Sequence, residues 1–356
     1  MNRRSVLLGG IGLAGAAGWV AASFRRRQVR EQLAAMLAPA ANPRQMQLRD
    51  FGRTGLKVSE VGFGAWGIGG QGYGAVDQQQ ALRTLARAEE LGCNFVDTAM
   101  VYGDSETLLG EFLVGRRSRW IVSTKFSGQS AGMSSTLETQ LKRLRTDAVE
   151  LYQLHWVPRG KDEHLLDEML RLKAAGKARF VGISLYSAED IDFVLARPEI
   201  DSFQVEFNLL EPDPFMARAE AIRASGKAVI VRSALREGFL TGKYQRDAKF
   251  PDPNDQRHAW TAAQIAETVD RTEQFRFLEQ QAGSMVAAAA RYPLSFSQVS
   301  TVILGTKSVS QADSNFGQVP GGRLAAGSLE RIRESQIALG LGSRWPRALR
   351  KAGLAP

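Results

Sequence analysis

Cysteine and histidine are scarce in this chain. A single cysteine, Cys93, stands among 356 residues, and the three histidines are His155, His164 and His258. One cysteine excludes a framework of disulfides within the chain, and so few soft ligands leave little material for a metal centre. We therefore expect a hydrophobic core, rather than cross-links or a metal, to stabilise the fold, and we assign no metal site.

Acidic residues are almost missing from one segment. Residues 1–44 contain seven arginines and one acid, Glu31, and hold +6 of the net charge of +9, whereas the remaining 312 residues are nearly balanced. The excess positive charge therefore belongs to the N-terminal segment and not to a patch on the globular part. This distribution argues against a nucleic acid as partner.

The N-terminal segment has two interpretations. It begins with the pair Arg3-Arg4 and continues with an uncharged, Gly/Ala-rich run over residues 5–24. Residues 1–27 resemble a twin-arginine signal, which would export the protein to the periplasm. The run is also close to the ~20 residues that span a bilayer. The basic stretch Arg25–Arg30 would then keep the globular part cytoplasmic, with residues 5–24 as an inner-membrane anchor.

The rest of the chain divides into a linker, a long regular region and a tail. Residues 28–45 are predicted to be the linker, 46–330 a single domain, and 331–356 a C-terminal helix with a basic tail. A turn signal at Arg53-Thr54-Gly55, between alternating apolar residues, predicts a short β-hairpin at the start of the domain.

Short apolar runs then alternate with amphipathic stretches. The predicted strands are Glu60–Phe63, Phe95–Asp97, Trp120–Thr124, Glu150–His155, Phe180–Ser184, Ser202–Glu206, Ala228–Arg232 and Thr301–Leu304. The predicted helices are Gln78–Leu91, Glu106–Val114, Ser135–Leu144, Glu163–Ala175, Ala188–Ala196, Pro214–Ser225 and Ala266–Arg291. Eight such strands in about 270 residues predict a (β/α)8 TIM barrel preceded by the hairpin.

The stretch VGFGAWGIGG, residues 61–70, contains G-x-G-x-x-G and raises the alternative of a Rossmann dinucleotide loop. In that motif the third glycine opens a helix directly. Here further glycines keep the chain irregular as far as Asp77, where Asp77-x-x-Gln80 marks a helix start. We therefore predict a loop at the mouth of the barrel, with Trp66 as an apolar wall of a substrate pocket.

Polar side chains end neighbouring strands on the face where barrels carry their active sites. Asp97 ends the second predicted strand, Lys125 follows the third, His155 ends the fourth, and Tyr102 lies in the loop after Asp97. A tyrosine acts as a general acid near neutral pH when a neighbouring cation favours its phenolate. A carboxylate keeps that cation charged, and a neutral imidazole can hydrogen-bond a carbonyl oxygen.

The same stretches resemble signatures of the aldo/keto reductase family, in order, over residues 46–315. The four polar residues lie in NFVDTAMVYGDSETLLGEFL, VSTKF and VELYQLHW, with GRTGLKVSEVGFGAW before them and VGIS, FQVEFNLLE, REGFLTGKY and ILGTKS after them. The resemblance implies NADPH-dependent reduction of an aldehyde or ketone, or its reverse. Tyr102 would supply the proton, Lys125 and Asp97 would tune it, and His155 would orient the carbonyl.

The resemblance also implies a cofactor site for NADPH (NADP⁺). It places the cofactor on Ser184, Gln204, Arg232, Ser233, Leu235, Gly238, Lys243, Gly305, Lys307, Ser308, Gln311 and Asn315. Lys307 and Ser308 suit a 2′-phosphate. Two positions depart from the family pattern: Leu185 replaces an asparagine that binds the carboxamide, and Arg232 replaces an aromatic that stacks on nicotinamide. We expect the charge of Arg232 to favour the reduced cofactor over NADP⁺.

The resemblance implies a small carbonyl compound as substrate. Trp66, Trp156 and the long segment 245–260 are predicted to line its pocket. The alternative function is a cofactor-bound regulatory or membrane-associated subunit with little turnover. The four polar residues favour an enzyme, whereas Leu185, Arg232 and the N-terminal segment keep the alternative open.

Overall fold

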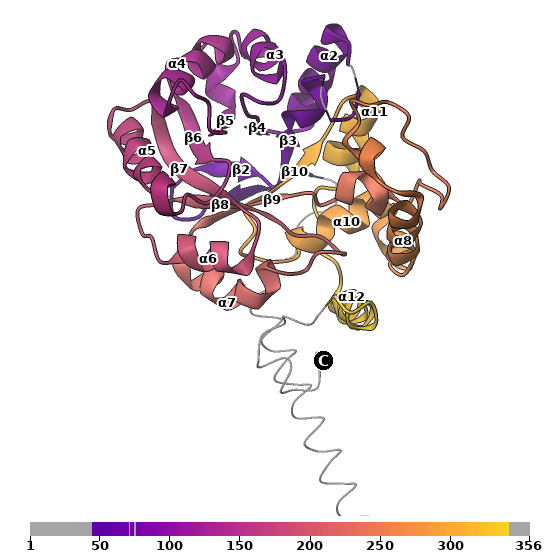
Figure 1. Cartoon of the computed structure of the whole chain (residues 1–356). Coiled ribbons are helices and arrows are strands. Elements are labelled where there is room, and N and C mark those ends of the chain that lie inside the picture. Colours follow the sequence, from indigo (N-terminus) through magenta and orange to yellow (C-terminus); the bar gives the residue numbers. More distant parts are fainter. Residues whose placement is uncertain (1–44, 71, 75, 342–356) are drawn as a thin grey trace, which may run out of the picture.

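Eight parallel strands close into a barrel in the computed structural model, which describes residues 45–70, 72–74 and 76–341 (Figure 1). Around the barrel their order is β10, β3, β4, β5, β6, β7, β8 and β9. Their bounds are β3 Val61–Gly64, β4 Phe95–Asp97, β5 Ile121–Phe126, β6 Val149–Leu154, β7 Ala178–Leu185, β8 Ser202–Glu206, β9 Ala228–Arg232 and β10 Thr301–Gly305. The predicted (β/α)8 barrel is confirmed.

Helices surround the sheet, so each strand is buried on both faces (Figure 1). This double burial is why the strands are continuous apolar runs, such as AVIV at the start of β9, instead of alternating patterns. The helices are α2 Gln78–Glu90, α3 Ser105–Phe112, α4 Met133–Leu144, α5 His164–Ala174, α6 Ala188–Leu195, α7 Phe215–Ser225, α8 Ala262–Glu273, α9 Leu278–Ala282, α10 Met285–Leu294, α11 Val309–Ala312 and α12 Ala326–Ala338.

The hairpin closes one end of the barrel. Strands β1 (Leu48–Asp50) and β2 (Lys57–Ser59) pair antiparallel, as the turn signal predicted. Phe51 and Val58 pack against Phe95, Ala228 and Ile230, which lie at or near the starts of their strands. The hairpin therefore covers the N-terminal end of the barrel and leaves the C-terminal ends of the strands for the site.

One predicted helix is wrong. The periodicity over Ala266–Arg291 predicted a single helix, but the structure breaks this region into α8, α9 and α10. Gly283 adopts a left-handed φ of 85° and ends α9, and the Ser284 hydroxyl then accepts a hydrogen bond from the Ala287 amide to start α10. A glycine followed by a serine is typical of one helix ending and the next beginning with an N-cap. The continuous apolar spacing of this region hides that break.

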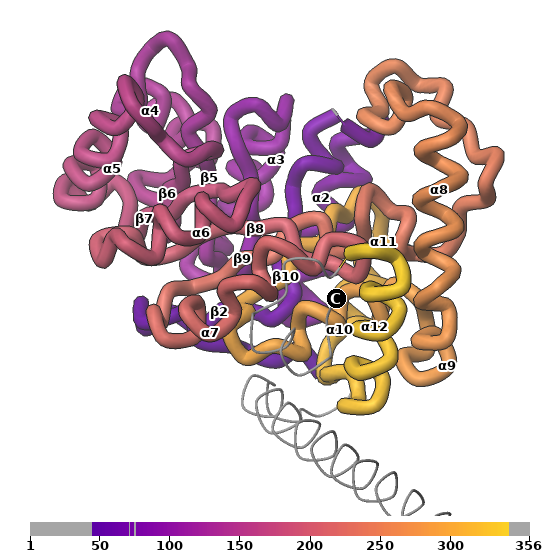
Figure 2. The backbone as a smooth tube through the Cα atoms, turned by 60° about the horizontal axis from the view of Figure 1, so that its bottom comes forward, coloured from indigo at the N-terminus to yellow at the C-terminus, as the bar shows by residue number. Residues whose placement is uncertain are grey.

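The C-terminal helix α12 lies beside α10 (Figure 2), where the Gln336 amide donates to the Tyr292 hydroxyl at 3.3 Å. The predictions for residues 1–44, including the N-terminal segment, lie outside the described residues, as does most of the basic tail after residue 341. Within the described residues, no helix has both the length and the apolar character needed to cross a membrane.

Candidate active site

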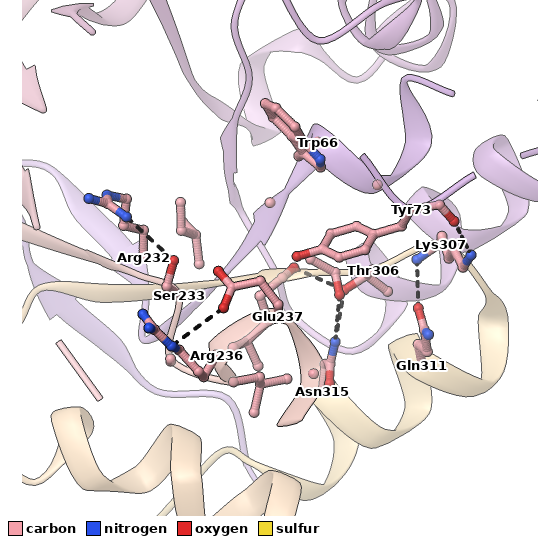
Figure 3. Close-up of a pocket in the computed structure, with 18 of the residues that line it drawn as sticks. Trp66, Tyr73, Arg232, Ser233, Arg236, Glu237, Thr306, Lys307, Gln311 and Asn315 are labelled. Atoms are coloured by element: carbon pink, nitrogen blue, oxygen red, sulfur yellow. Dashed lines mark hydrogen bonds and ion pairs between the residues drawn. The ribbon is translucent and has the colours of Figure 1, made fainter. Parts of the chain in front are cut away.

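A cavity of about 740 Å³ opens at the C-terminal end of the barrel. Tyr102 and His155 line it, and so do residues of the loop after β10, among them Lys307 and Asn315. Figure 3 shows Arg232 and Lys307 on opposite sides of this cavity, with Tyr73 and Glu237 between them. Groups that follow several different strands therefore face the same cavity, where one ligand can contact them.

The strongest interaction beneath the cavity is an ion pair between adjacent strands. The Lys125 ammonium on β5 donates to Asp97 Oδ2 at the end of β4 over 2.5 Å, and to the Thr98 carbonyl over 2.8 Å. Lys125 is fully buried and Asp97 nearly so. Without each other these charges would be too costly to bury, so the pair fixes the lysine in place.

Tyr102 lies above this pair, in the loop between β4 and α3. Its hydroxyl is 3.4 Å from Lys125 Nζ and 3.5 Å from His155 Nε2. The edge of its ring contacts Trp66, with the ring centroids 4.6 Å apart. A β-carbon at Gly69 would lie 1.7 Å from the Tyr102 carbonyl oxygen, so a glycine in the first loop is required for the tyrosine to sit here.

Burial and the neighbouring charges both shift the pKa of Tyr102. Burial raises the pKa of Tyr102 by more than the neighbouring Lys125 lowers it, so the net shift is upward. Burial also opposes the charged form of Lys125, but Asp97 and Tyr102 together raise its pKa. The sequence led us to expect a lowered tyrosine pKa. The structure instead holds Tyr102 protonated, which is the form that donates a proton.

His155 follows β6 and points at the same hydroxyl. Burial, Lys125 and Arg232 lower its pKa from 6.5 to about 3, so the imidazole is neutral near pH 7. Its Nδ1 lies 2.7 Å from Ser127 Oγ. A phenol, a neutral imidazole and a buried cation thus surround one position in the cavity, and this set can hydrogen-bond a carbonyl oxygen and supply a proton to it.

A second set of polar side chains supports Asp97 from inside the barrel. Ser123 Oγ donates to Asp97 Oδ1 at 3.0 Å, and Gln153 Nε2 donates to the same oxygen at 3.1 Å. These two bonds occupy Oδ1 and leave Oδ2 to Lys125. Neither Ser123 nor Gln153 can be assigned to the site from the sequence, because a polar residue inside a barrel strand looks like a structural one until its register is known.

Among the predicted cofactor residues, Ser184, Gln204 and Arg232 each present a buried polar atom without a hydrogen-bond partner among the described residues, which in Arg232 is Nε. The other two atoms are Ser184 Oγ and Gln204 Nε2, and both side chains line the cavity. Buried polar atoms are rarely left unpaired, so the pair fits a ligand amide. Arg232 also lines the cavity, where Glu206 pairs with it at 3.2 Å and Tyr186 lies under its guanidinium.

Most of the other predicted residues reach the cavity, and two do not. Those lining it are Trp66, Ser233, Leu235, Gly238, Lys243, Gly305, Lys307, Gln311 and Asn315. Ser308 instead caps α11 by accepting from the Gln311 amide, and the Trp156 ring packs against the Phe126 ring. Neither side chain is among those that line the cavity.

A model of the aldo/keto reductase family matches residues 60–337. The chain belongs to the aldo/keto reductase family. Aldo-keto reductase str7 of Strobilurus tenacellus is 30% identical over 282 residues, which cover 73% of this chain and 84% of that protein. Aldo-keto reductase yakc [NADP(+)] of Schizosaccharomyces pombe is 27% identical over 316 residues, which cover 81% of this chain and 92% of that protein.

A solved aldo-keto reductase has the same fold. The holo form of AKR11C1 from Bacillus halodurans superimposes with a TM-score of 0.68 at 26% identity, covering 82% of this chain and 96% of that one. The barrel is therefore that of an aldo/keto reductase, and this chain is an oxidoreductase of that family.

This aldo/keto reductase closes one side of its cavity with a contact that the sequence did not predict. The Gly72 amide donates to the Asn254 carbonyl at 3.1 Å, and the Gln256 amide donates back to Gly72 at 3.0 Å. Gln256 also bonds the Tyr73 hydroxyl, and the Arg257 guanidinium lies 5.1 Å from the Tyr73 ring centroid. The predicted pocket segment 245–260 is thus joined to the first loop.

The neutral His155 makes a prediction about acid stability. Between pH 6.5 and 3 the unfolded chain binds a proton at this imidazole more readily than the folded chain does, because folding lowers the pKa of His155. The free energy of unfolding is therefore highest above pH 6.5 and decreases as the pH falls toward 3. We expect the free energy of unfolding to drop over this window by at most about 1.4 kcal/mol per pH unit, less because water still reaches the ring.

Urea unfolding at several pH values measures this loss. His155→Gln should flatten the curve between pH 6.5 and 3 relative to the wild type. His164→Gln is the matched control, because His164 is exposed on α5 and should leave the slope unchanged. Parallel wild-type and His155→Gln curves would show that the acid loss comes from other groups.

Proposed function

We propose that this chain is an NADPH-dependent reductase that converts an aldehyde or ketone to an alcohol, or catalyses the reverse. The observation that carries the proposal is the position of the Tyr102 hydroxyl, 3.4 Å from Lys125 Nζ and 3.5 Å from His155 Nε2 at the wall of the cavity. The bound nicotinamide would supply the hydride that the side chains cannot.

The chain's own residues would then bind the oxygen and move the proton. A carbonyl oxygen beside Tyr102 accepts hydrogen bonds from its hydroxyl and from the imidazole of His155. As negative charge develops on that oxygen, Tyr102 donates its proton to it. Lys125 stabilises the phenolate that results, and Asp97 keeps Lys125 charged throughout, since the pair is buried together.

Side chains at both ends of the cavity support the choice of NADPH. The unpaired Ser184 Oγ and Gln204 Nε2 suit the carboxamide of nicotinamide. At the other end, Lys307 supplies a cation for a 2′-phosphate, which agrees with the relative from S. pombe that is named for NADP(+). Arg232 lies at the nicotinamide end, where Glu206 offsets part of its charge. We expect what remains of that charge to favour NADPH over NADP⁺.

The test uses the purified full-length chain. Cofactor binding is followed by tryptophan fluorescence with NADPH, NADP⁺ and NADH, and turnover by loss of NADPH absorbance on a panel of aldehydes, ketones and quinones. We expect the lowest Kd for NADPH and turnover on at least one carbonyl. Tight binding without turnover would instead favour a cofactor-bound regulatory subunit, and no binding of NADPH would overturn the cofactor assignment.

We also propose that the twin-arginine-like segment, residues 1–27, exports the folded barrel to the periplasm. A signal of this kind carries folded proteins, so the cofactor can travel already bound. Replacing Arg3 and Arg4 by lysine should retain the protein in the cytoplasm, measured by fractionation and N-terminal sequencing. An uncleaved chain in the inner-membrane fraction, unaffected by the substitutions, would support the anchor with a cytoplasmic barrel.

A further inference from the structure

The two ring nitrogens of His155 face different partners. Nε2 points at the Tyr102 hydroxyl, 3.5 Å away, while Nδ1 lies 2.7 Å from Ser127 Oγ. A neutral imidazole carries one proton, on either nitrogen, and the hydrogen bond at the other nitrogen decides which. The partner at Nδ1 therefore determines what His155 presents to the cavity.

Ser127 follows β5, and its amide and its hydroxyl have different partners. Its amide donates to Gln129 Oε1 at 3.0 Å, which holds the turn. Its hydroxyl has no other hydrogen-bond acceptor among the described residues than His155 Nδ1. A hydroxyl can both donate and accept. Among the described residues, His155 Nδ1 is the only atom to which the Ser127 hydroxyl can donate its proton.

We propose that Ser127 is a positioning residue that holds His155 in the tautomer with the proton on Nε2. The ring then directs an N–H donor at the position that the Tyr102 hydroxyl also faces, so two donors converge on one oxygen. In the other tautomer Nε2 would present a lone pair, which repels a carbonyl oxygen. The catalytic meaning of this tautomer rests on the proposed carbonyl reduction, but the tautomer itself does not.

The other two histidines provide an internal contrast. His164 Nδ1 lies 2.8 Å from the Lys161 carbonyl oxygen, and His258 Nδ1 lies 2.8 Å from the Phe250 carbonyl oxygen. A carbonyl oxygen accepts only, so in these contacts Nδ1 must carry the proton. The chain therefore places its three histidines in two opposite hydrogen-bonding patterns, and only His155 has a hydroxyl at Nδ1.

Nitrogen NMR of the full-length chain tests the assignment. With ¹⁵N-histidine at pH 8, a two-bond ¹H–¹⁵N correlation separates protonated from unprotonated ring nitrogens, and His155→Gln identifies the signals of that ring. We expect Nε2 of His155 to be the protonated nitrogen. Ser127→Ala should shift the ring toward a mixture of tautomers, and Ser127→Thr, which keeps the hydroxyl, should restore the wild-type pattern.

Activity gives the second measurement. Ser127→Ala should lower kcat/KM for a carbonyl substrate by about 2- to 10-fold, the effect of one hydrogen bond, without changing the Kd for NADPH. Ser187→Ala, which removes a helix cap on α6, controls for a loss of serine elsewhere. A proton on Nδ1 in the wild type, or an unchanged pattern in Ser127→Ala, would overturn the proposal. If the NMR shows the proton on Nε2 but the chain reduces no carbonyl compound, the role of Ser127 in setting the tautomer stands and only the proposed function is contradicted.

Discussion

Replacing Tyr102 by phenylalanine should lower kcat for carbonyl reduction by about 10²- to 10⁴-fold, the usual contribution of a general acid. The variant removes the hydroxyl that faces Lys125 and His155 and keeps the ring that contacts Trp66. Because both hydrogen bonds of the hydroxyl are long, at 3.4 and 3.5 Å, we expect a change in stability of less than about 1 kcal/mol.

Single-turnover and steady-state kinetics, with NADPH binding measured alongside, check this result. The Kd for NADPH should stay at the wild-type value, so the loss falls on the chemical step. Tyr152→Phe is the matched control, because Tyr152 is also buried and its hydroxyl has no partner among the described residues. A Tyr102→Phe variant within a few-fold of wild-type kcat would mean that another group donates the proton.

Replacing Lys125 by methionine should abolish turnover and also weaken the fold. The substitution leaves Asp97 as a buried carboxylate without its cation, which typically costs about 3–5 kcal/mol. The donors Ser123 and Gln153 remain on Oδ1 and reduce this cost. The phenolate of Tyr102 loses its stabilising charge at the same time, so kcat should fall at least as far as in Tyr102→Phe.

The double variant Asp97→Asn with Lys125→Met separates the two effects. It removes both charges, so urea unfolding should recover much of the stability, while turnover stays at the level of the single variant. Lys227→Met is the control for loss of a buried lysine. Lys227 donates to the Arg197 and Ile200 carbonyls at the opposite end of the barrel, so its loss should lower stability without lowering kcat. Recovery of activity in the double variant would contradict the assigned role.

Periodicity and residue type were sufficient for the barrel and for the four residues around the candidate site. Each strand is an apolar run with a polar residue near its end, and parallel strands bring those ends to one face, so Asp97, Lys125 and His155 could be placed together from spacing alone. The glycines of the first loop similarly excluded a Rossmann turn, since the helix starts only after Asp77.

Contacts between segments far apart in the chain could not be predicted from local sequence patterns. Gln153 looks like any strand residue until the pairing of β4 with β5, and of β5 with β6, brings it to Asp97. The break at Gly283 was hidden under an apolar repeat, and the joining of the first loop to Asn254 and Gln256 depends on two loops that meet only in space.

By itself the sequence determined the (β/α)8 barrel and the chemical identity of the four polar groups, because local hydrophobic pattern and residue type carry that information. The family came from the resemblance of its motifs. Only the tertiary structure decided that burial raises the pKa of Tyr102 despite Lys125, that Ser127 faces His155 Nδ1, and that Ser308 and Trp156 are not among the residues that line the cavity. These features depend on desolvation and on small differences in interatomic distance. Both are set by packed neighbours and not by any single stretch of chain.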